Sequence, residues 1–165
     1  MGMVVGRQAW RVGLLTLCLA FCMPAAAQAQ HWWHVGERGS APGRVEEFVD
    51  QASIRGKAGH KLVSTMLVTE QPMAGGVNTM DSIYEVDCRA SRSRSVARGA
   101  IDASGARAGQ LDTAMLPWLH NRSGSFAANV QALACRGKLP DVAVDIGSLD
   151  PQLVTRAYFD SGSPD

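Results

Sequence analysis

Two cysteines constrain the fold of this chain more than any other feature of its sequence. Of its four cysteines, Cys18 and Cys22 lie in an amino-terminal segment typical of a secretion signal. Cys88 and Cys135 are then the pair that remains after export. An even number of cysteines in an oxidising compartment predicts a disulfide, and two buried free thiols are the alternative. The bond would close a loop of about 48 residues and stabilise the fold by roughly 4 kcal/mol.

The first 29 residues predict a signal peptide that is removed on export. Arg7 and Arg11 precede an apolar run over residues 12–23, which Pro24 ends. As a helix the run would be roughly 18 Å long, too short for the about 30 Å hydrocarbon core of a bilayer. The small residues Ala27 and Ala29 fit signal peptidase specificity, so we expect cleavage after Ala29. Bulky residues precede both leader cysteines, so we predict no lipid anchor. The mature chain would be periplasmic, exposed on the cell surface or secreted.

The mature chain has the length of one domain and is nearly neutral. About 136 residues are enough for a single hydrophobic core. Without Arg7 and Arg11 the 16 lysines and arginines fall to 14, against 15 acidic residues, so the expected net charge is −1. Attraction to nucleic acid is therefore not expected. From residue 139 onward five aspartates face one arginine. We predict a domain over residues 30–138 and an acidic tail over residues 139–165.

Alternation of apolar and polar residues predicts several β-strands. The expected strands cover residues 33–35, 44–49, 61–69, 82–88 and 92–101. The third of these has apolar side chains on both faces and should be central. In the fourth, Tyr84, Val86 and Cys88 share the face that we expect to point into the core. Turn-forming residues predict connections over residues 36–43 and 71–80.

A helix is predicted over residues 125–135. Phe126, Val130 and Leu133 recur at helical spacing, and Gly137 stands where a left-handed cap would follow. Ser123 or Ser125 would cap its start. Strands followed by a helix indicate an α+β fold, an antiparallel β-sheet covered by a C-terminal α-helix. Cys135 at the helix end would be joined to Cys88 at a strand end.

The acidic tail contains the pattern of one more short helix. Asp150 can act as its cap, Pro151 suits the first helical position, and Leu153, Val154 and Ala157 follow at helical spacing. We expect this helix to be loosely attached to the domain.

Arg92, Arg94 and Arg98 are the candidate ligand-binding residues. On a regular strand they line one face and could present guanidinium groups to sulfate, phosphate or carboxylate. The alternative is a solvated sheet face, on which they pair with Glu85 and Asp87 of the neighbouring strand.

The sequence predicts neither an enzyme, nor a metal site, nor a cofactor. It has no Gly-x-Ser-x-Gly element or phosphate-binding loop, and no acid, base and nucleophile that can be named together. His31 and His34, three apart on a strand, point to opposite faces and cannot hold one ion there. Copper binding at the mature amino terminus, where His31 would be second, stays open. Trp32 is either a surface anchor or part of the packing, which is the more frequent use of a large aromatic.

Four segments together resemble the surface-adhesin protein E family of Gram-negative bacteria. They lie between Trp32 and Cys135 and read WWHVGE, EEFVDQASIRGKAGHKLVSTMLVTE, SIYEVDCRASRSRS and ANVQALAC. The resemblance implies an antiparallel sheet joined to a C-terminal helix through Cys88 and Cys135, and a location in the cell envelope. The family's name-giving member looks like a lipid-anchored adhesin for host matrix proteins, whereas this chain lacks an acceptable lipidation cysteine and adds an acidic tail.

These observations predict a non-catalytic exported binding domain. Its partner would be an extracellular protein or an anionic polysaccharide, recognised by the face with Arg92, Arg94 and Arg98. The alternative is a periplasmic structural or accessory protein in which the arginines only balance carboxylates.

Overall fold

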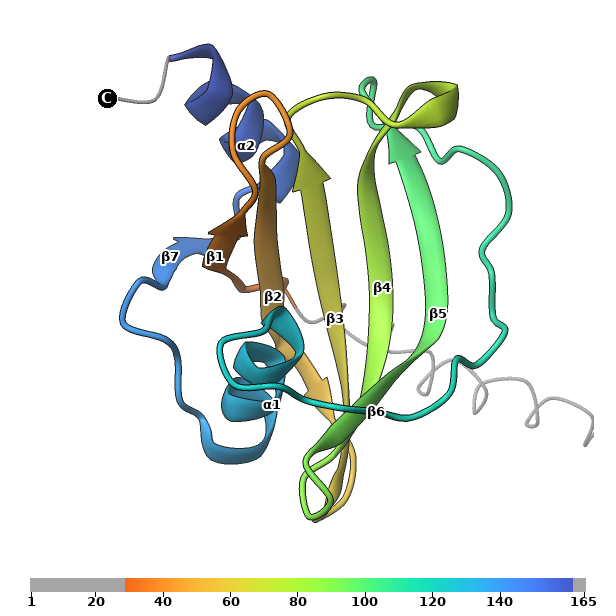
Figure 1. Ribbon diagram of the computed structural model, residues 1–165, viewed down its shortest axis with the longest axis vertical. Helices are drawn as coiled ribbons and strands as arrows, with labels where there is room; N and C mark the ends of the chain where they lie inside the picture. The colour runs from red at the N-terminus through yellow and green to blue at the C-terminus, as the bar shows by residue number, and fades with distance from the viewer. Residues whose placement is uncertain (1–28, 162–165) are drawn as a thin grey trace, which may run out of the picture.

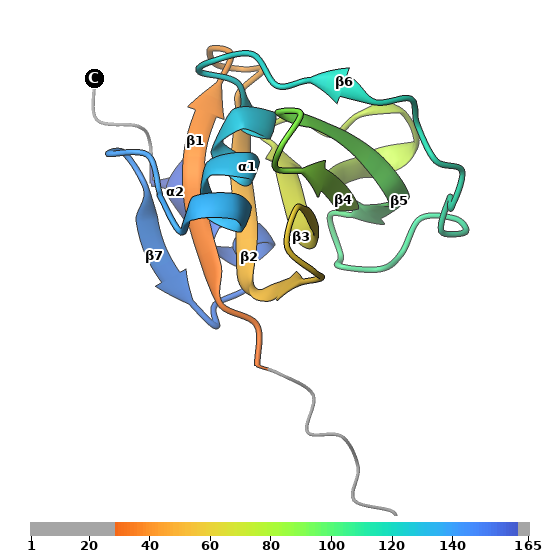
Figure 2. The same cartoon turned by 90° about the horizontal axis from the view of Figure 1, so that it is seen from below.

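The structure, a computed structural model, describes residues 29–161 and consists of one antiparallel sheet with a helix on each face (Figures 1 and 2). The predicted signal peptide, apart from Ala29, lies outside the described residues. The strands are β1 (Trp32–Arg38), β2 (Val45–Arg55), β3 (His60–Thr69), β4 (Val77–Asp87), β5 (Arg92–Asp102), β6 (Leu119–His120) and β7 (Val144–Gly147). The helices are α1 (Phe126–Arg136), α2 (Pro151–Asp160) and a 3-10 turn, η1 (Ala74–Gly76).

The sheet is a meander from β1 to β6, and the last strand of the chain, β7, is added beside β1. Its strand order is β6-β5-β4-β3-β2-β1-β7, so β7 lies next to β1 although more than a hundred residues separate them. All of its pairings are antiparallel. The predicted antiparallel sheet is confirmed, and the central position of residues 61–69 is confirmed by β3.

Two of the predicted connections are shorter than expected. Residues 36–38 continue β1, and residues 77–80 begin β4. Gly75 and Gly76 do lie in a turn, but Thr79 and Met80 already pair with Val68 and Leu67 of β3. Hydrogen bonding to a neighbouring strand therefore extends β4 beyond what local composition indicated.

The first face of the sheet packs against α1. Val35, Val49, Val63 and Val86 come from four adjacent strands and contact Phe126, Val130 and Leu133 of the helix. The Ser125 hydroxyl accepts the backbone N–H of Ala128, and Gly137 ends the helix with φ of 64°, so both predicted caps are confirmed. The predicted α+β arrangement, with a helix over one sheet face, is confirmed.

The predicted disulfide between Cys88 and Cys135 is present. The two Cα atoms are 5.7 Å apart, within the usual range for such a bond. It joins the end of β4 to the last turn of α1. Gln131 reinforces the same junction, because its amide donates to the Ser91 hydroxyl and accepts from Asn121. The helix is thus fixed to the β4–β5 turn by a covalent bond and by part-buried hydrogen bonds.

The second face packs against α2, and the expected loose attachment of the tail is wrong. Trp32 is buried there with Phe48 and Val68, so its role is packing. The predicted short helix exists, with Asp150 as its cap. Its Gln152 side chain is buried and donates to the Asn78 side chain and the Asp102 carbonyl. Figure 2 shows α1 and α2 on opposite sides of β1 and β2. Residues 144–160 therefore add the edge strand β7 and cover part of the second face with α2.

Asp87 is expected to make the fold sensitive to acid. The backbone N–H groups of Ala90 and Arg89 and the guanidinium of Arg92 hold the pKa of the Asp87 carboxyl below its usual range. A lowered folded-state pKa gives stability that is complete above the unfolded pKa, near 4, and is lost as the pH falls through the folded value. We expect Asp87→Asn to lower the urea midpoint at pH 7 and to lose this effect progressively below about pH 4.

Glu47→Gln is the matched control, because the pH dependence of its effect on stability should have the opposite sign. Burial raises the pKa of the Glu47 carboxyl, although Arg38 opposes this shift. A raised folded-state pKa gives a contribution that is present below the unfolded value and is lost as the pH rises. The stability of Glu47→Gln relative to the parent should therefore increase between about pH 4 and pH 7. Parallel pH profiles for the two variants would contradict both assignments.

Candidate functional site

The three candidate arginines do not share a face. Val96 is a bulge residue, because Ala97 pairs with Ile83 while Ser95 pairs with Tyr84. The extra residue reverses the alternation along β5. Arg92 and Arg94 therefore lie on the second face, whereas Arg98 lies on the first face, opposite Ser82, and pairs with Asp112. The predicted three-arginine surface is wrong in this respect.

Arg92 and Arg94 are paired with the carboxylates that the sequence offered as their alternative partners. Arg94 contacts Glu85 at 2.7 Å and Arg92 contacts Asp87 at 3.1 Å. Trp118, which no sequence pattern marked as a site residue, packs against both guanidinium groups. The Cζ atoms of Arg94 and Arg92 are 4.5 and 4.9 Å from its ring centre. Both arginine charges are thus largely compensated within the protein.

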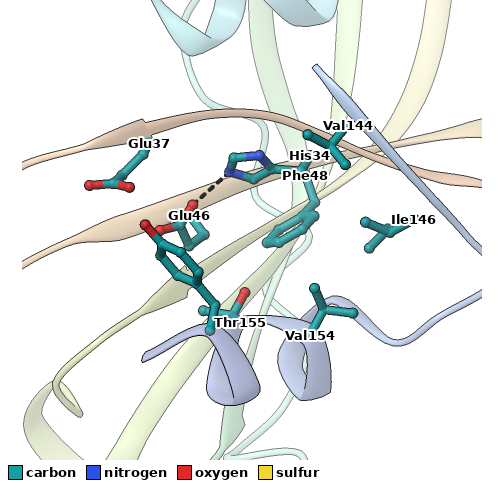
Figure 3. A pocket seen from close by; sticks show the side chains of 9 residues that line it. His34, Glu37, Glu46, Phe48, Val144, Ile146, Val154 and Thr155 are labelled. Atoms are coloured by element: carbon teal, nitrogen blue, oxygen red, sulfur yellow. Dashed lines mark hydrogen bonds and ion pairs between the residues drawn. The ribbon is translucent and has the colours of Figure 1, made fainter. Parts of the chain in front are cut away.

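A pocket of about 280 Å³ opens on the second face, between the sheet and α2 (Figure 3). Its lining comes from β1, β2, β7 and α2, and no sequence pattern predicted this pocket. The lining residues are His34, Glu37, Glu46, Phe48, Val144, Ile146, Val154, Thr155 and Tyr158. Most of these side chains are apolar or aromatic, with a few polar groups among them, which is the usual composition of a small-molecule site.

A bulge in β1 directs both glutamates of the pocket to the same face. His34 pairs with Phe48 and Gly36 pairs with Glu47, so Val35 is the extra residue. As a result Glu37 lies directly opposite Glu46, on the face of the sheet that carries the pocket. Without the bulge the alternation would turn Glu37 toward the first face.

Glu46 is the most buried charged group of the pocket, with 4% of its surface exposed. Its Oε2 is 2.6 Å from Nε2 of His34, drawn as the dashed line in Figure 3. A carboxylate can only accept, so Nε2 carries the hydrogen of this bond. Oε1 of Glu46 is buried and has no hydrogen-bond partner in the described protein. A buried carboxylate oxygen without a partner is unfavourable, because it has lost its hydration.

Thr155 adds a second unsatisfied polar atom to the pocket. It projects from the α2 side of the lining in Figure 3 and is only 1% exposed. Its Oγ1 also has no hydrogen-bond partner within residues 29–161. A threonine hydroxyl can both donate and accept. The pocket therefore offers two buried polar atoms that a ligand or water can satisfy.

Arg44 fixes the end of α2 beside the pocket. Its guanidinium pairs with Glu70 at 2.9 Å and lies 5.5 Å from the ring centre of Tyr158 and 4.9 Å from that of Phe159. The hydrogen bond from Arg44 lowers the pKa of the Glu70 carboxyl. Cation–π contacts of this kind position aromatic rings. Arg44 therefore holds the Tyr158 wall of the pocket while its charge is compensated by Glu70.

The remaining features give no other site in the described part of the chain. His31 lies 3.0 Å from Asp145 of β7 and His60 lies 3.6 Å from Glu85. Residues 29–161 contain no group of three or more side chains arranged to hold a metal ion. Over the same residues no helix has the length and hydrophobicity needed to cross a membrane.

Comparisons with known proteins identify no relative of this chain. No family model matches the sequence, and neither curated proteins nor solved structures give a match. The resemblance to the surface-adhesin protein E family therefore stays a prediction that rests on the four sequence segments and on their order along the chain.

Proposed function

We propose that this protein is an exported, non-catalytic binding domain whose ligand occupies the pocket between the sheet and α2. The observation that carries the proposal is a preformed, mainly apolar pocket with two buried polar atoms, Glu46 Oε1 and Thr155 Oγ1, that lack protein partners. Native proteins satisfy nearly all buried polar groups. A ligand with matching hydrogen-bonding groups would remove this deficit.

A binding role fits the polar groups better than catalysis does. His34 and Glu46 are an imidazole–carboxylate pair, which can transfer protons in enzymes. A nucleophile would have to contact the imidazole. Thr155 supplies the aliphatic hydroxyl of the pocket lining, and its Oγ1 makes no hydrogen bond to His34. The pair instead joins β1 to β2 at the floor of the pocket.

Export is supported by the disulfide, because such bonds persist mainly in oxidising compartments. The amino-terminal sequence supports it independently. Fractionation of cells followed by intact-mass measurement should find the chain outside the cytoplasm, starting at Gln30 and with Cys88 joined to Cys135. A full-length chain in the cytoplasm would contradict this part of the proposal.

Binding to the pocket can be tested with a fragment library and amide NMR spectra of the mature protein. Some fragments should shift resonances of β7 and α2, because these elements form one wall. Val154→Trp should fill the pocket and abolish the shifts. Leu153→Trp is the matched control, because Leu153 is exposed on the same helix and does not line the pocket. If no fragment binds at millimolar concentration, or if Val154→Trp binds them unchanged, the proposal fails.

Recognition of an anionic polymer through Arg92 and Arg94 is a second candidate. It is favoured by Trp118, which holds both guanidinium groups on one surface, and by the 40% exposure of the Arg92 side chain. Fixed, partly exposed guanidiniums can contact sulfate or carboxylate with little further ordering.

Charge reversal tests this second candidate. If Arg94 contacts the polymer, Arg94→Glu should elute from heparin at clearly lower salt than the parent, because each lost contact reduces counterion release. Arg136→Glu, at the exposed end of α1 on the opposite face of the sheet, makes the same change in net charge and serves as the control. Equal retention of the two variants would leave the arginines with only their structural role, in pairs with Glu85 and Asp87.

A further inference from the structure

We infer that the pocket selects a small organic cation, namely a protonated amine attached to an apolar body. This inference rests on the proposed function and specifies the ligand of the same site. It follows from three features of the lining, which are its charge, its unsatisfied atoms and its aromatic walls.

The charge of the lining is negative. Glu37 and Glu46 are directly opposite each other on neighbouring strands, and both line the pocket. Like charges in directly opposite positions destabilise a sheet unless a positive group lies between or beside them. The lining contains one basic side chain, His34, and it contacts Glu46. Nearby Arg44 attracts Glu37 at longer range and is itself paired with Glu70. A cation bound between the two glutamates would relieve their repulsion.

The unsatisfied atoms call for a hydrogen-bond donor. Glu46 Oε1 can only accept, so a ligand must bring an N–H or O–H group to satisfy it. A charged donor makes a stronger bond to a carboxylate than a neutral one does. A carboxylate or phosphate ligand would instead place a second negative charge beside a buried one, which is strongly unfavourable. Thr155 Oγ1, the other unsatisfied atom of the lining, can accept a further N–H.

The walls fit an ammonium group with an apolar body. The rings of Phe48 and Tyr158 line the pocket and can attract a cation through their π faces. Val144, Ile146 and Val154 form an apolar wall opposite the glutamates in Figure 3. The volume of about 280 Å³ lies just below the range usual for drug-sized ligands. The ligand is therefore a small aryl- or alkylamine rather than a polyamine or a peptide.

A series of three probes of similar shape tests the inference. Benzylamine, benzyl alcohol and benzoate share one ring and differ in charge, and their binding to the mature protein can be measured at pH 7 by NMR titration. Benzylamine should bind at least about tenfold more tightly than benzyl alcohol, because of the charge-assisted bond, and benzoate should not bind measurably. Equal binding of the amine and the alcohol, or preferred binding of benzoate, would overturn the inference.

Variants assign the selectivity to the two glutamates. Glu46→Gln keeps the shape but presents a neutral group, and should weaken benzylamine about tenfold while benzyl alcohol changes by less than about twofold. Glu37→Gln changes an exposed position and removes a like charge opposite Glu46, so it should not destabilise the fold, and it should weaken benzylamine by about two- to threefold. Glu85→Gln removes the same charge outside the pocket and should leave both affinities unchanged.

The two possible failures are distinguishable. If fragments of other classes bind and Val154→Trp blocks them, but benzylamine shows no preference, the pocket binds ligands and the inferred ligand class is wrong. If no probe or fragment of any charge binds, the pocket holds only water and both proposals are wrong. A preference for benzylamine that survives both Glu46→Gln and Glu37→Gln would also overturn the role assigned to the glutamates.

Discussion

A mature chain that ends at Leu139 is expected to be less stable than the parent by about 5 kcal/mol or more, and to expose tryptophan and aggregate. The deletion removes β7 and α2, which cover the second face of the sheet. Trp32, Phe48 and Val68 are almost completely buried there, and full burial of a large apolar side chain contributes about 1.5–3 kcal/mol. Domains of this size are stable by only about 5–15 kcal/mol in total.

The measurement is urea denaturation followed by tryptophan emission. The truncated chain should show a red-shifted emission already without denaturant and a transition that is lost or strongly lowered. A truncated chain with the midpoint of the parent would show that residues 140–161 only rest on the domain, as the sequence analysis expected.

Two single substitutions on α2 test whether the stability comes from the contacts of this helix with the sheet or only from the greater length of the chain. Gln152→Ala removes the two part-buried hydrogen bonds to Asn78 and Asp102. We expect it to cost about 2 kcal/mol. Leu153→Ala changes a neighbouring residue that is 62% exposed and should cost no more than about 0.5 kcal/mol. Equal effects of the two substitutions would contradict the docking of α2.

Removal of the disulfide is expected to have the second largest effect. The bond joins residues that are 47 positions apart, and a loop of this length corresponds to about 4 kcal/mol of stabilisation. The double variant Cys88→Ser, Cys135→Ser should therefore melt roughly 15 °C below the oxidised parent. Thermal unfolding followed by circular dichroism measures this difference, with the parent in reducing agent as a second reduced sample.

Loss of the bond should leave the pocket intact at temperatures where the variant is folded. The disulfide lies beside α1, and the pocket lies on the opposite face of the sheet. Gln131 still holds α1 to the β4–β5 turn through Ser91 and Asn121. Fragment binding at low temperature should therefore match that of the parent. Identical melting temperatures with and without the bond, or two free thiols in the exported protein, would contradict the assignment.

Sequence patterns predicted the features of this fold that depend on neighbouring residues. The helix over residues 125–135 has its apolar spacing, its cap at Ser125 and its left-handed Gly137 within thirteen consecutive positions. The strand with Tyr84, Val86 and Cys88 faces the core as its alternation indicated. Both elements are determined by local propensity together with burial of one side.

The same patterns failed where a single residue interrupts the strand pairing. Alternation through Arg92, Arg94 and Arg98 is regular in the sequence, but the bulge at Val96 turns Arg98 to the other face. A bulge is a property of two paired strands, and neither strand alone encodes it. The bulge at Val35, which places Glu37 opposite Glu46, was missed for the same reason.

The pocket could not be predicted because its parts are far apart in the chain. His34 and Thr155 come from opposite ends of the described residues, and Val144 and Ile146 lie on a strand of four residues that forms only beside β1. Such a short strand gives almost no periodic signal. Prediction of the site would have required knowledge that β7 pairs with β1. The one local indication of a site was Glu46, a charged residue among the core residues of β2.

Because β7 pairs with β1, the fold can be completed only after nearly the whole chain is available. β1 is made first, yet its free edge is covered only when residues 144–147 are available. Until then a strand that carries two tryptophans presents an open edge and an uncovered apolar face to its surroundings. A chain that crosses a membrane from its amino terminus would be exposed in this way throughout its passage, and it would become able to hold a ligand only when nearly its whole length had arrived.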